Sequence, residues 1–517
     1  MRPDVSAQFH PVACSLAASQ QTVLAGAGNS LSRKSCLIVF GAGLLLKVAL
    51  IALFPALYGG DTVLHLRNHE SIFLGHQLPM LQMLIFASYK ITTYPMFFRV
   101  VMALIGATAG AGFYLLCGRV VSQEAAFWAA LFFVSNPFLN EISIVPFQEM
   151  LMLGALCFFV YFYASGRLAA ASLLLGIACL TRYEAWIACP ALLVHYWAGH
   201  RFERRKLLSA FALFCWAPAL WIGGHLGLSS PGTYVIEMPR SALRLVRWLY
   251  LGWIAIKDTP ALVVLLSLLG LYAVHKRRLF RQPAVLLFSC FAAAFLIAIL
   301  FSAHGDPRPG SDNAEAFVTS REATLIVGYV LILAGIGLEY LLGRRRQLAL
   351  WLGGAAVVLG VAQSAQFVAK ETAQPDVALS YGAARYLNAH VSKADRVLVL
   401  AKAFTENDWK LYFQTVEQLE GERGLAEARS KFRQTDHSPI SFQRIAVQTS
   451  LPEQRLFASA DLDSVEWIVV WSDYTGPIGL SRHLLKLQQA EELDAGTLRV
   501  RIFRRVRESA RAVQLRD

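Results

Sequence analysis

Apolar residues dominate long stretches of the chain, and short polar turns interrupt them at intervals. A helix that crosses the hydrocarbon core of a membrane needs about 20 predominantly apolar residues. The pattern predicts eleven such helices, of which three (123–138, 168–180 and 184–198) fall short of this length. Short helices with polar ends are tolerated where they line a cavity enclosed by protein. The predicted spans are 36–58, 97–117, 123–138, 148–164, 168–180, 184–198, 207–228, 258–275, 283–303, 323–342 and 348–368.

Basic residues are distributed unevenly among the segments that join these helices. Five short loops on one predicted face hold 13 Lys and Arg in 33 residues, whereas the loops on the other face hold 9 in 103 residues. Because the positive-inside rule assigns basic loops to the cytoplasm, the N-terminus is predicted to be cytoplasmic and the longer loops extracytoplasmic. With an odd number of spans, the C-terminal segment is outside as well. The basic loops are 118–124, 165–168, 199–207, 275–282 and 343–347.

The last part of the chain has a different pattern. Residues 371–517 hold 20 basic and 20 acidic residues, so the net charge of +13 lies entirely in the first 370. A segment with apolar residues at helical spacing is followed by a run that is typical of a buried strand, and two more strand patterns come later in the sequence. The expected helices are 377–391, 406–418 and 479–491, and the expected strands are 396–400, 466–471 and 497–503.

These patterns predict a polytopic α-helical membrane protein with about 11 transmembrane helices and a C-terminal soluble α/β domain. The expected parts are a disordered cytoplasmic arm (1–35), a transmembrane domain (36–370) and an extracytoplasmic α/β domain (371–517). Composition supports a membrane protein, because only 16% of the residues are charged, against about 25% in soluble domains. The positive net charge does not indicate a nucleic-acid partner, since the basic residues lie in turns between apolar runs. Membrane lipids are the expected surroundings.

The first predicted outer loop carries an acidic residue directly after a span, where a charge is costly without a role. Asp61, His65 and His69 lie about one helical turn apart, on one face of a helix that begins at Asp61. Three interpretations stay open: the carboxylate caps the helix, the three residues bind a metal, or Asp61 is a general base. We favour the general base, because a carboxylate at the lipid–water boundary can accept a proton from an attacking hydroxyl. No metal site is predicted.

Two further polar segments lie on the same predicted face. Gln82 follows a proline break at Pro79 and suits a loop that lines a substrate cavity, although an ordinary turn explains it nearly as well. Glu149 begins a strongly apolar helix, so its carboxylate either interacts with the helix dipole or faces a site. Several polar residues surround this position in sequence: Asn136, Asn140, Glu141 and Gln148.

Arginines on this face are candidate phosphate ligands, because the guanidinium fork matches phosphate oxygens. Arg182 and Glu184 lie between two short spans, where they either pair with each other or contact lipid head groups or substrate. Arg321 directly precedes an apolar span on the face where topology disfavours positive charge, so it is either an anchor or a substrate ligand.

Taken together, these segments resemble the GT-C class of polyprenyl-phosphate-sugar glycosyltransferases. The closest groups are glycosyltransferase family 39, the protein O-mannosyltransferases and the lipid A aminoarabinose transferases. The resemblance covers roughly residues 37–200 and continues more weakly through Ser320-Arg321-Glu322 and the C-terminal segment. It rests on Gly60-Asp61-Thr62 with Gly75 and Leu78-Pro79, and on a stretch with Phe98-Arg99, Tyr114-Leu115, Ala125-Ala126, Asn136-Pro137 and Glu149-Met150.

The resemblance implies a role for each candidate. Asp61 is then the catalytic base, Glu149 orients acceptor or donor, and Arg321 together with Arg182 neutralises the lipid phosphate. Many relatives carry Asp-Glu at the first motif, whereas Thr62 follows Asp61 here. The resemblance therefore does not extend to a paired-acid site.

On this interpretation the chain is an inner-membrane glycosyltransferase. It moves a sugar, with inversion, from a polyprenyl-phosphate donor to a hydroxyl of a lipid, glycan or protein acceptor on the extracytoplasmic face. The sequence predicts no particular cofactor; a divalent metal is compatible with it but is not predicted. The alternative is a transporter or lipid-linked glycan flippase, which the absence of duplicated halves disfavours. A membrane sensor would leave Asp61 and Glu149 as helix caps.

Overall fold

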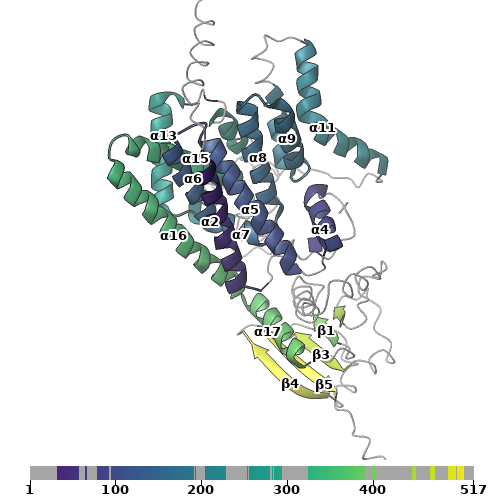
Figure 1. The fold of residues 1–517 in the computed structure, drawn as a ribbon. Helices are drawn as coiled ribbons and strands as arrows, with labels where there is room; N and C mark the ends of the chain where they lie inside the picture. The colour runs from purple at the N-terminus through teal and green to yellow at the C-terminus, as the bar shows by residue number, and fades with distance from the viewer. Residues whose placement is uncertain are drawn as a thin grey trace, which may run out of the picture.

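Two architectures follow one another along the chain. Among the described residues, a bundle of helices makes up most of the chain, and a five-stranded sheet with a helix beside it makes up the last part (Figure 1). The computed structural model describes residues 32–56, 65–66, 78–91, 95–190, 192–193, 204–228, 253, 256–279, 282, 285–293, 324–390, 397–401, 445–449, 466–471, 487–495 and 498–505.

The helices of the bundle follow the predicted apolar runs closely where both can be compared. Of the described helices, four are long and apolar enough to cross a membrane (α2, α5, α15 and α16), or five if the bent pair α7 and α8 is one span. The predicted count of eleven stays a prediction. The helices are α2 (Arg33–Leu53), α4 (Pro79–Ile91), α5 (Pro95–Cys117), α6 (Gln123–Ser135), α7 (Pro137–Ile144), α8 (Gln148–Ala164), α9 (Leu168–Cys179), the 3-10 helix η2 (Tyr183–Ile187), α11 (Arg204–Leu228), α13 (Ala261–Arg277), α15 (Thr324–Leu342) and α16 (Arg346–Thr372).

Two prolines begin helices that the sequence pattern did not predict. Pro79, expected as a break beside a loop, opens α4, and Pro137, which lies in the predicted span 123–138, opens the separate helix α7. Proline is tolerated at the first helical position, because the N–H that it lacks has no intrahelical partner there. At α7 the Asn136 side chain caps the helix by accepting a hydrogen bond from the Leu139 N–H at 3.0 Å. The segment before α8 is therefore ordered by its own helix.

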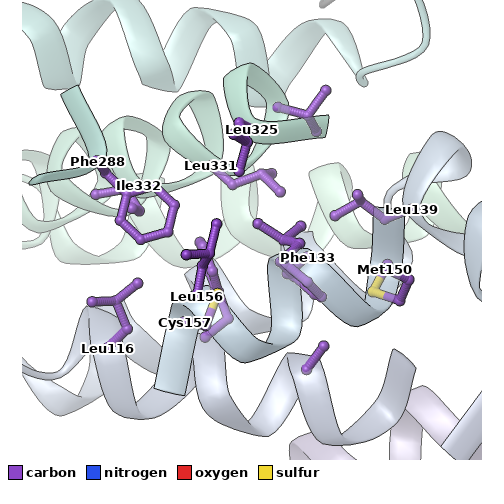
Figure 2. Packing of buried hydrophobic residues seen from close by; sticks show 14 of the residues in the cluster. Leu116, Phe133, Leu139, Met150, Leu156, Cys157, Phe288, Leu325, Leu331 and Ile332 are labelled. Atoms are coloured by element: carbon purple, nitrogen blue, oxygen red, sulfur yellow. The ribbon is translucent and has the colours of Figure 1, made fainter. Parts of the chain in front are cut away.

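The core of the bundle is apolar and nearly continuous. Its side chains come mainly from α2, from α5 to α9, from residues 185–192, from α11, from residues 285–293 and from α13, α15 and α16. Figure 2 shows part of it, where side chains from facing helices fill the space between the ribbons. The labelled side chains are Leu116, Phe133, Leu139, Met150, Leu156, Cys157, Phe288, Leu325, Leu331 and Ile332.

A buried polar chain crosses this core. The ammonium of Lys47 on α2 is 1% exposed and donates to Asn140 Oδ1 on α7 at 2.8 Å. Asn140 Nδ2 in turn donates to Ser364 Oγ on α16 at 2.9 Å. Because buried polar groups are stable only when hydrogen-bonded, this chain fixes the register of α2, α7 and α16 relative to one another.

Helices α13 and α15 approach at the level of their backbones. A Cβ atom added at Gly270 would lie 1.8 Å from the Leu333 carbonyl oxygen, and one at Gly337 would lie 2.0 Å from the Leu266 carbonyl oxygen. Small residues permit such close packing of helices in membranes. We expect Gly270→Ala to lower the free energy of unfolding by about 1–3 kcal/mol, because the helices must separate.

Thermal unfolding of the purified protein in detergent measures this effect. Gly354→Ala on α16 is the matched control, since a Cβ there meets nothing within 4 Å. Equal melting temperatures for Gly270→Ala and Gly354→Ala would contradict the close packing.

In the last part of the chain, the described residues form a mixed sheet with a helix packed against it. The strand order is β2-β1-β3-β5-β4; β1 pairs in parallel with β2 and β3, while β5 pairs antiparallel with β3 and β4. The three strands predicted from the sequence are β1, β3 and β5, and the predicted helix 377–391 is α17. The elements are α17 (Pro375–His390), β1 (Val397–Ala401), β2 (Ile445–Thr449), β3 (Trp467–Trp471), β4 (Leu487–Asp494) and β5 (Arg499–Arg505).

One prediction for this part is wrong. The segment 479–491 was expected to be a helix, but Leu487–Asp494 is the edge strand β4. Its Leu, Gln and Glu residues favour helices, yet pairing with β5 outweighs this preference. The helix expected at 406–418 lies outside the described residues, and the division at residues 35 and 370 stays a prediction.

The bundle has two chemically distinct ends. At one end, contacts join four of the predicted basic loops. Arg119 in the loop 118–124 donates to Ser165 Oγ in the loop 165–168, and Arg346 in the loop 343–347 pairs with Glu124. The guanidinium groups of Arg277, from the loop 275–282, and Arg344 both lie over the Tyr340 ring. The sheet and α17 lie at the other end, where α16 finishes (Figure 1). These four loops therefore share one end, as their alternation predicts, whereas the place of the loop 199–207 and the orientation of the bundle in a membrane stay predictions.

Candidate active site

A buried carboxylate lies at the end of the bundle opposite the basic loops. Glu149 occupies the first turn of α8, and its side chain is 3% exposed. Its Oε1 atom accepts a hydrogen bond from Arg182 NH1 at 2.5 Å. Its Oε2 atom is buried and has no hydrogen-bond partner among the described residues. One oxygen of this carboxylate is thus held by Arg182, while the other is buried and lacks a donor among the described residues.

Arg182 joins Glu149 to a second carboxylate. It lies between α9 and η2, and its Nε and NH2 atoms donate to the Glu184 carboxylate at 3.1 and 2.5 Å. The sequence left open whether Arg182 and Glu184 pair with each other, and the structure shows that they do. Two carboxylates and one guanidinium give this trio a net charge of −1, so an anion gains little from approaching it.

The local environment keeps Glu184 ionised. It lies in the short 3-10 turn η2, outside the helices long enough to span a membrane. Burial alone would raise the pKa of this carboxyl, but the charge and hydrogen bonds of Arg182 outweigh burial and hold the pKa below its ordinary value. The ion pair with Arg182 therefore persists at neutral pH.

A neutral hydrogen-bonded group adjoins this trio. His65, 2% exposed, places its Nδ1 atom 3.1 Å from Gln82 Oε1, and Gln82 Nε2 donates to the His65 carbonyl oxygen at 3.2 Å. The other ring nitrogen, Nε2, is 3.2 Å from Gln148 Nε2. Since an amide NH₂ can only donate, His65 accepts at Nε2 and carries its proton at Nδ1, where Gln82 Oε1 accepts.

Adjacent residues at the start of α8 connect the two groups. Gln148 contacts His65, while Glu149 contacts Arg182, so polar side chains from four separate segments form one continuous set. The α4 segment is tied in by its backbone as well, because the Met80 N–H donates to the Leu180 carbonyl oxygen at 3.0 Å. The set consists of His65, Gln82, Gln148, Glu149, Arg182 and Glu184.

Five of the eight residues predicted from the sequence thus come together: His65, Gln82, Glu149, Arg182 and Glu184. The other three, Asp61, His69 and Arg321, lie outside the described residues. Within the described part of the chain, no three His, Cys, Asp or Glu residues form a metal-binding group. The metal interpretation of Asp61, His65 and His69 stays untested, because two of its members are not described.

The sequence pattern missed three residues that organise this end of the bundle. Gln148 was grouped with a polar patch but given no role, although it joins the two halves of the site. Lys47 and Arg99 were given no role either, yet both are almost fully buried. A single cation within an otherwise apolar run was the available signal, since such a charge inside a membrane helix requires a partner.

Comparison with known proteins identifies the fold. No protein-family model matches the chain, and no curated protein matches it. The crystal structure of ArnT from Cupriavidus metallidurans in the apo state is similar, with a TM-score of 0.51 and 13% sequence identity, over 90% of this chain and 97% of that one. ArnT bound to undecaprenyl phosphate gives a TM-score of 0.52 and 13% identity, over 91% and 98%. The chain therefore has the fold of ArnT.

Proposed function

We propose that the protein is a membrane glycosyltransferase that moves a sugar from a polyprenyl-phosphate donor to an acceptor hydroxyl, with inversion, on the extracytoplasmic face of an inner membrane. The shared fold supports the class of enzyme, and the ArnT structure with undecaprenyl phosphate supports a polyprenyl-phosphate partner. The sugar and the acceptor are left open.

The observation that carries this proposal is the half-satisfied carboxylate of Glu149. Leaving a buried acceptor unpaired costs about 1–3 kcal/mol, more when it is charged. A sugar hydroxyl supplies the donor that Oε2 lacks, while the hydrogen bond from Arg182 to Oε1 orients the carboxylate. Glu149 is then a binding and orienting residue that acts through its free oxygen.

The charges around Arg182 indicate different roles for Arg182 and Arg321. Arg182 already faces two carboxylates, so a lipid phosphate near this trio would meet a net negative charge. We therefore assign the phosphate to Arg321, and we assign to Arg182 the orientation of Glu149. This division refines the initial expectation that the two arginines share the phosphate.

The transfer itself needs one base. The acceptor oxygen forms a bond to the anomeric carbon of the sugar, and Asp61 takes the proton of the acceptor hydroxyl. The bond between the anomeric carbon and the phosphate oxygen breaks, and the electron pair leaves with the polyprenyl phosphate. Displacement from the opposite face inverts the anomeric centre, and a cation stabilises the charge that grows on the phosphate.

The test is transfer by the purified protein in proteoliposomes. A panel of polyprenyl-phosphate sugars with radiolabelled sugar is supplied together with membrane lipids, glycans and peptides as acceptors. We expect label from one donor to become covalently attached to one acceptor class, with release of polyprenyl phosphate. If intact labelled donor instead crosses the bilayer without release of polyprenyl phosphate, the protein is a flippase and the proposal is wrong.

A further inference from the structure

Arg99 is a buried cation at the same end of the bundle as the candidate site. It is the fifth residue of α5 and is 2% exposed, so its guanidinium lies inside the protein. A charged group in this position is costly unless several hydrogen bonds satisfy it. The acceptors of its hydrogen bonds therefore indicate which parts of the chain Arg99 holds together.

The guanidinium donates to backbone carbonyls at the ends of two other helices. NH2 donates to the Phe54 carbonyl oxygen at 3.2 Å, and NH1 donates to the Pro55 carbonyl oxygen at 2.9 Å, where α2 ends. Nε donates to the carbonyl oxygen of Ile144, the last residue of α7, at 3.0 Å. The last carbonyls of a helix lack intrahelical partners and carry the negative end of its dipole, so a cation is favoured at both places.

The two helix ends lead directly into the segments that carry the proposed catalytic acid and the orienting acid. Asp61 follows Pro55 by six residues, and Glu149 follows Ile144 by five. Between Ile144 and α8 the backbone is tight, since the Phe147 N–H donates to the Val145 carbonyl oxygen at 2.7 Å. A shift of Ile144 is therefore passed on to the start of α8 and to Glu149.

We propose that Arg99 is a positioning residue, which holds the end of α2, six residues before Asp61, and the end of α7, five residues before Glu149, at a fixed distance from each other. This inference rests on the proposed transferase function. An arginine suits the task because its planar fork presents several N–H groups at fixed angles, whereas a lysine has a single nitrogen. The side chain is 2% exposed and donates to backbone carbonyls of both chain segments, so its proposed effect acts through these segments.

The experiment compares Arg99→Lys and Arg99→Met with the unaltered protein in nanodiscs. Lysine keeps the charge and much of the bulk, so this variant is expected to fold even if Arg99→Met does not. For Arg99→Lys we expect kcat to fall about 10- to 100-fold, because a displacement of about 1 Å in a reacting group has an effect of this size. We expect the donor KM to change less than about threefold, because the donor-binding groups remain.

Hydrogen–deuterium exchange provides a readout that does not depend on activity. Peptides covering 54–61 and 144–149 should exchange faster in Arg99→Lys, while peptides from 118–124 at the opposite end should not change. Arg119→Met is the matched control: Arg119 follows the other end of α5, donates to Ser165 Oγ, and has no link to either segment. This control should leave kcat and exchange at both segments unchanged.

Each outcome decides the proposal. Unchanged kcat in Arg99→Lys, or faster exchange throughout the chain instead of in the two segments, would overturn the positioning role. If the unaltered protein transfers no sugar, the proposed function fails, and exchange at the two segments alone then decides whether Arg99 clamps them.

Discussion

Replacing Asp61 with asparagine should lower kcat for sugar transfer by about 100- to 10,000-fold, the range expected for loss of a general base. The asparagine amide has almost the same size as the carboxylate but cannot take the proton of the acceptor hydroxyl. We therefore expect the melting temperature and the donor KM to stay close to those of the unaltered protein. Initial rates with a radiolabelled donor, measured alongside thermal unfolding, check both expectations.

Glu124→Gln is the matched control for this substitution. Glu124 is a carboxylate of the same bundle, but it pairs with Arg346 at the basic end and is partly exposed. Its removal should not change the rate of transfer. Transfer by Asp61→Asn at the normal rate would leave Asp61 as a helix cap and would favour a scaffold or sensor over an enzyme.

Replacing Arg182 with methionine should be the most destabilising change at the site. The substitution leaves Glu149, whose side chain is 3% exposed, and Glu184 without their shared cation. Removing one partner of a buried ion pair costs about 3–5 kcal/mol, because the remaining charge is uncompensated. We expect a value near the lower limit, since Arg182 is 21% exposed and water can reach it. Thermal and denaturant unfolding in detergent measure the loss.

A second substitution tests whether the uncompensated charge is the cause. Adding Glu149→Gln to Arg182→Met removes the buried charge, so the double variant should recover part of the lost stability. If the double variant is as unstable as Arg182→Met, the loss comes from packing of the arginine side chain, and the ion pair with Glu149 is not what holds this end of α8.

Hydrophobic pattern alone predicted most of the helices. The apolar runs at 97–117, 148–164 and 323–342 match α5, α8 and α15 within two residues at each end. This agreement has a simple cause, since a helix in lipid must satisfy its backbone hydrogen bonds internally and cover itself with apolar side chains. The loops were harder, because short-range signals such as Asn136-Pro137 fit both a turn and the start of a helix.

The sheet contains a strand that the local sequence pattern did not predict. Residues 487–494 have the composition of a helix, and only their pairing with β5 makes them a strand. Strand formation depends on a partner that lies elsewhere in the sequence, so no local pattern reveals it. The three strands with runs of β-branched and aromatic residues were predicted because their composition and their partners agree.

The sequence by itself determined that this chain is a helical membrane protein, that its basic loops share one face, and that Glu149, Arg182 and Glu184 are candidate site residues. Only the tertiary structure decided that one guanidinium holds both carboxylates, that Gln148 links them to His65, and that Arg99 joins the ends of α2 and α7. The physical reason is that apolar periodicity and charge act locally along the chain. Hydrogen bonds between side chains and distant carbonyls instead depend on how the helices pack, which brings residues 45 positions apart within 3.2 Å.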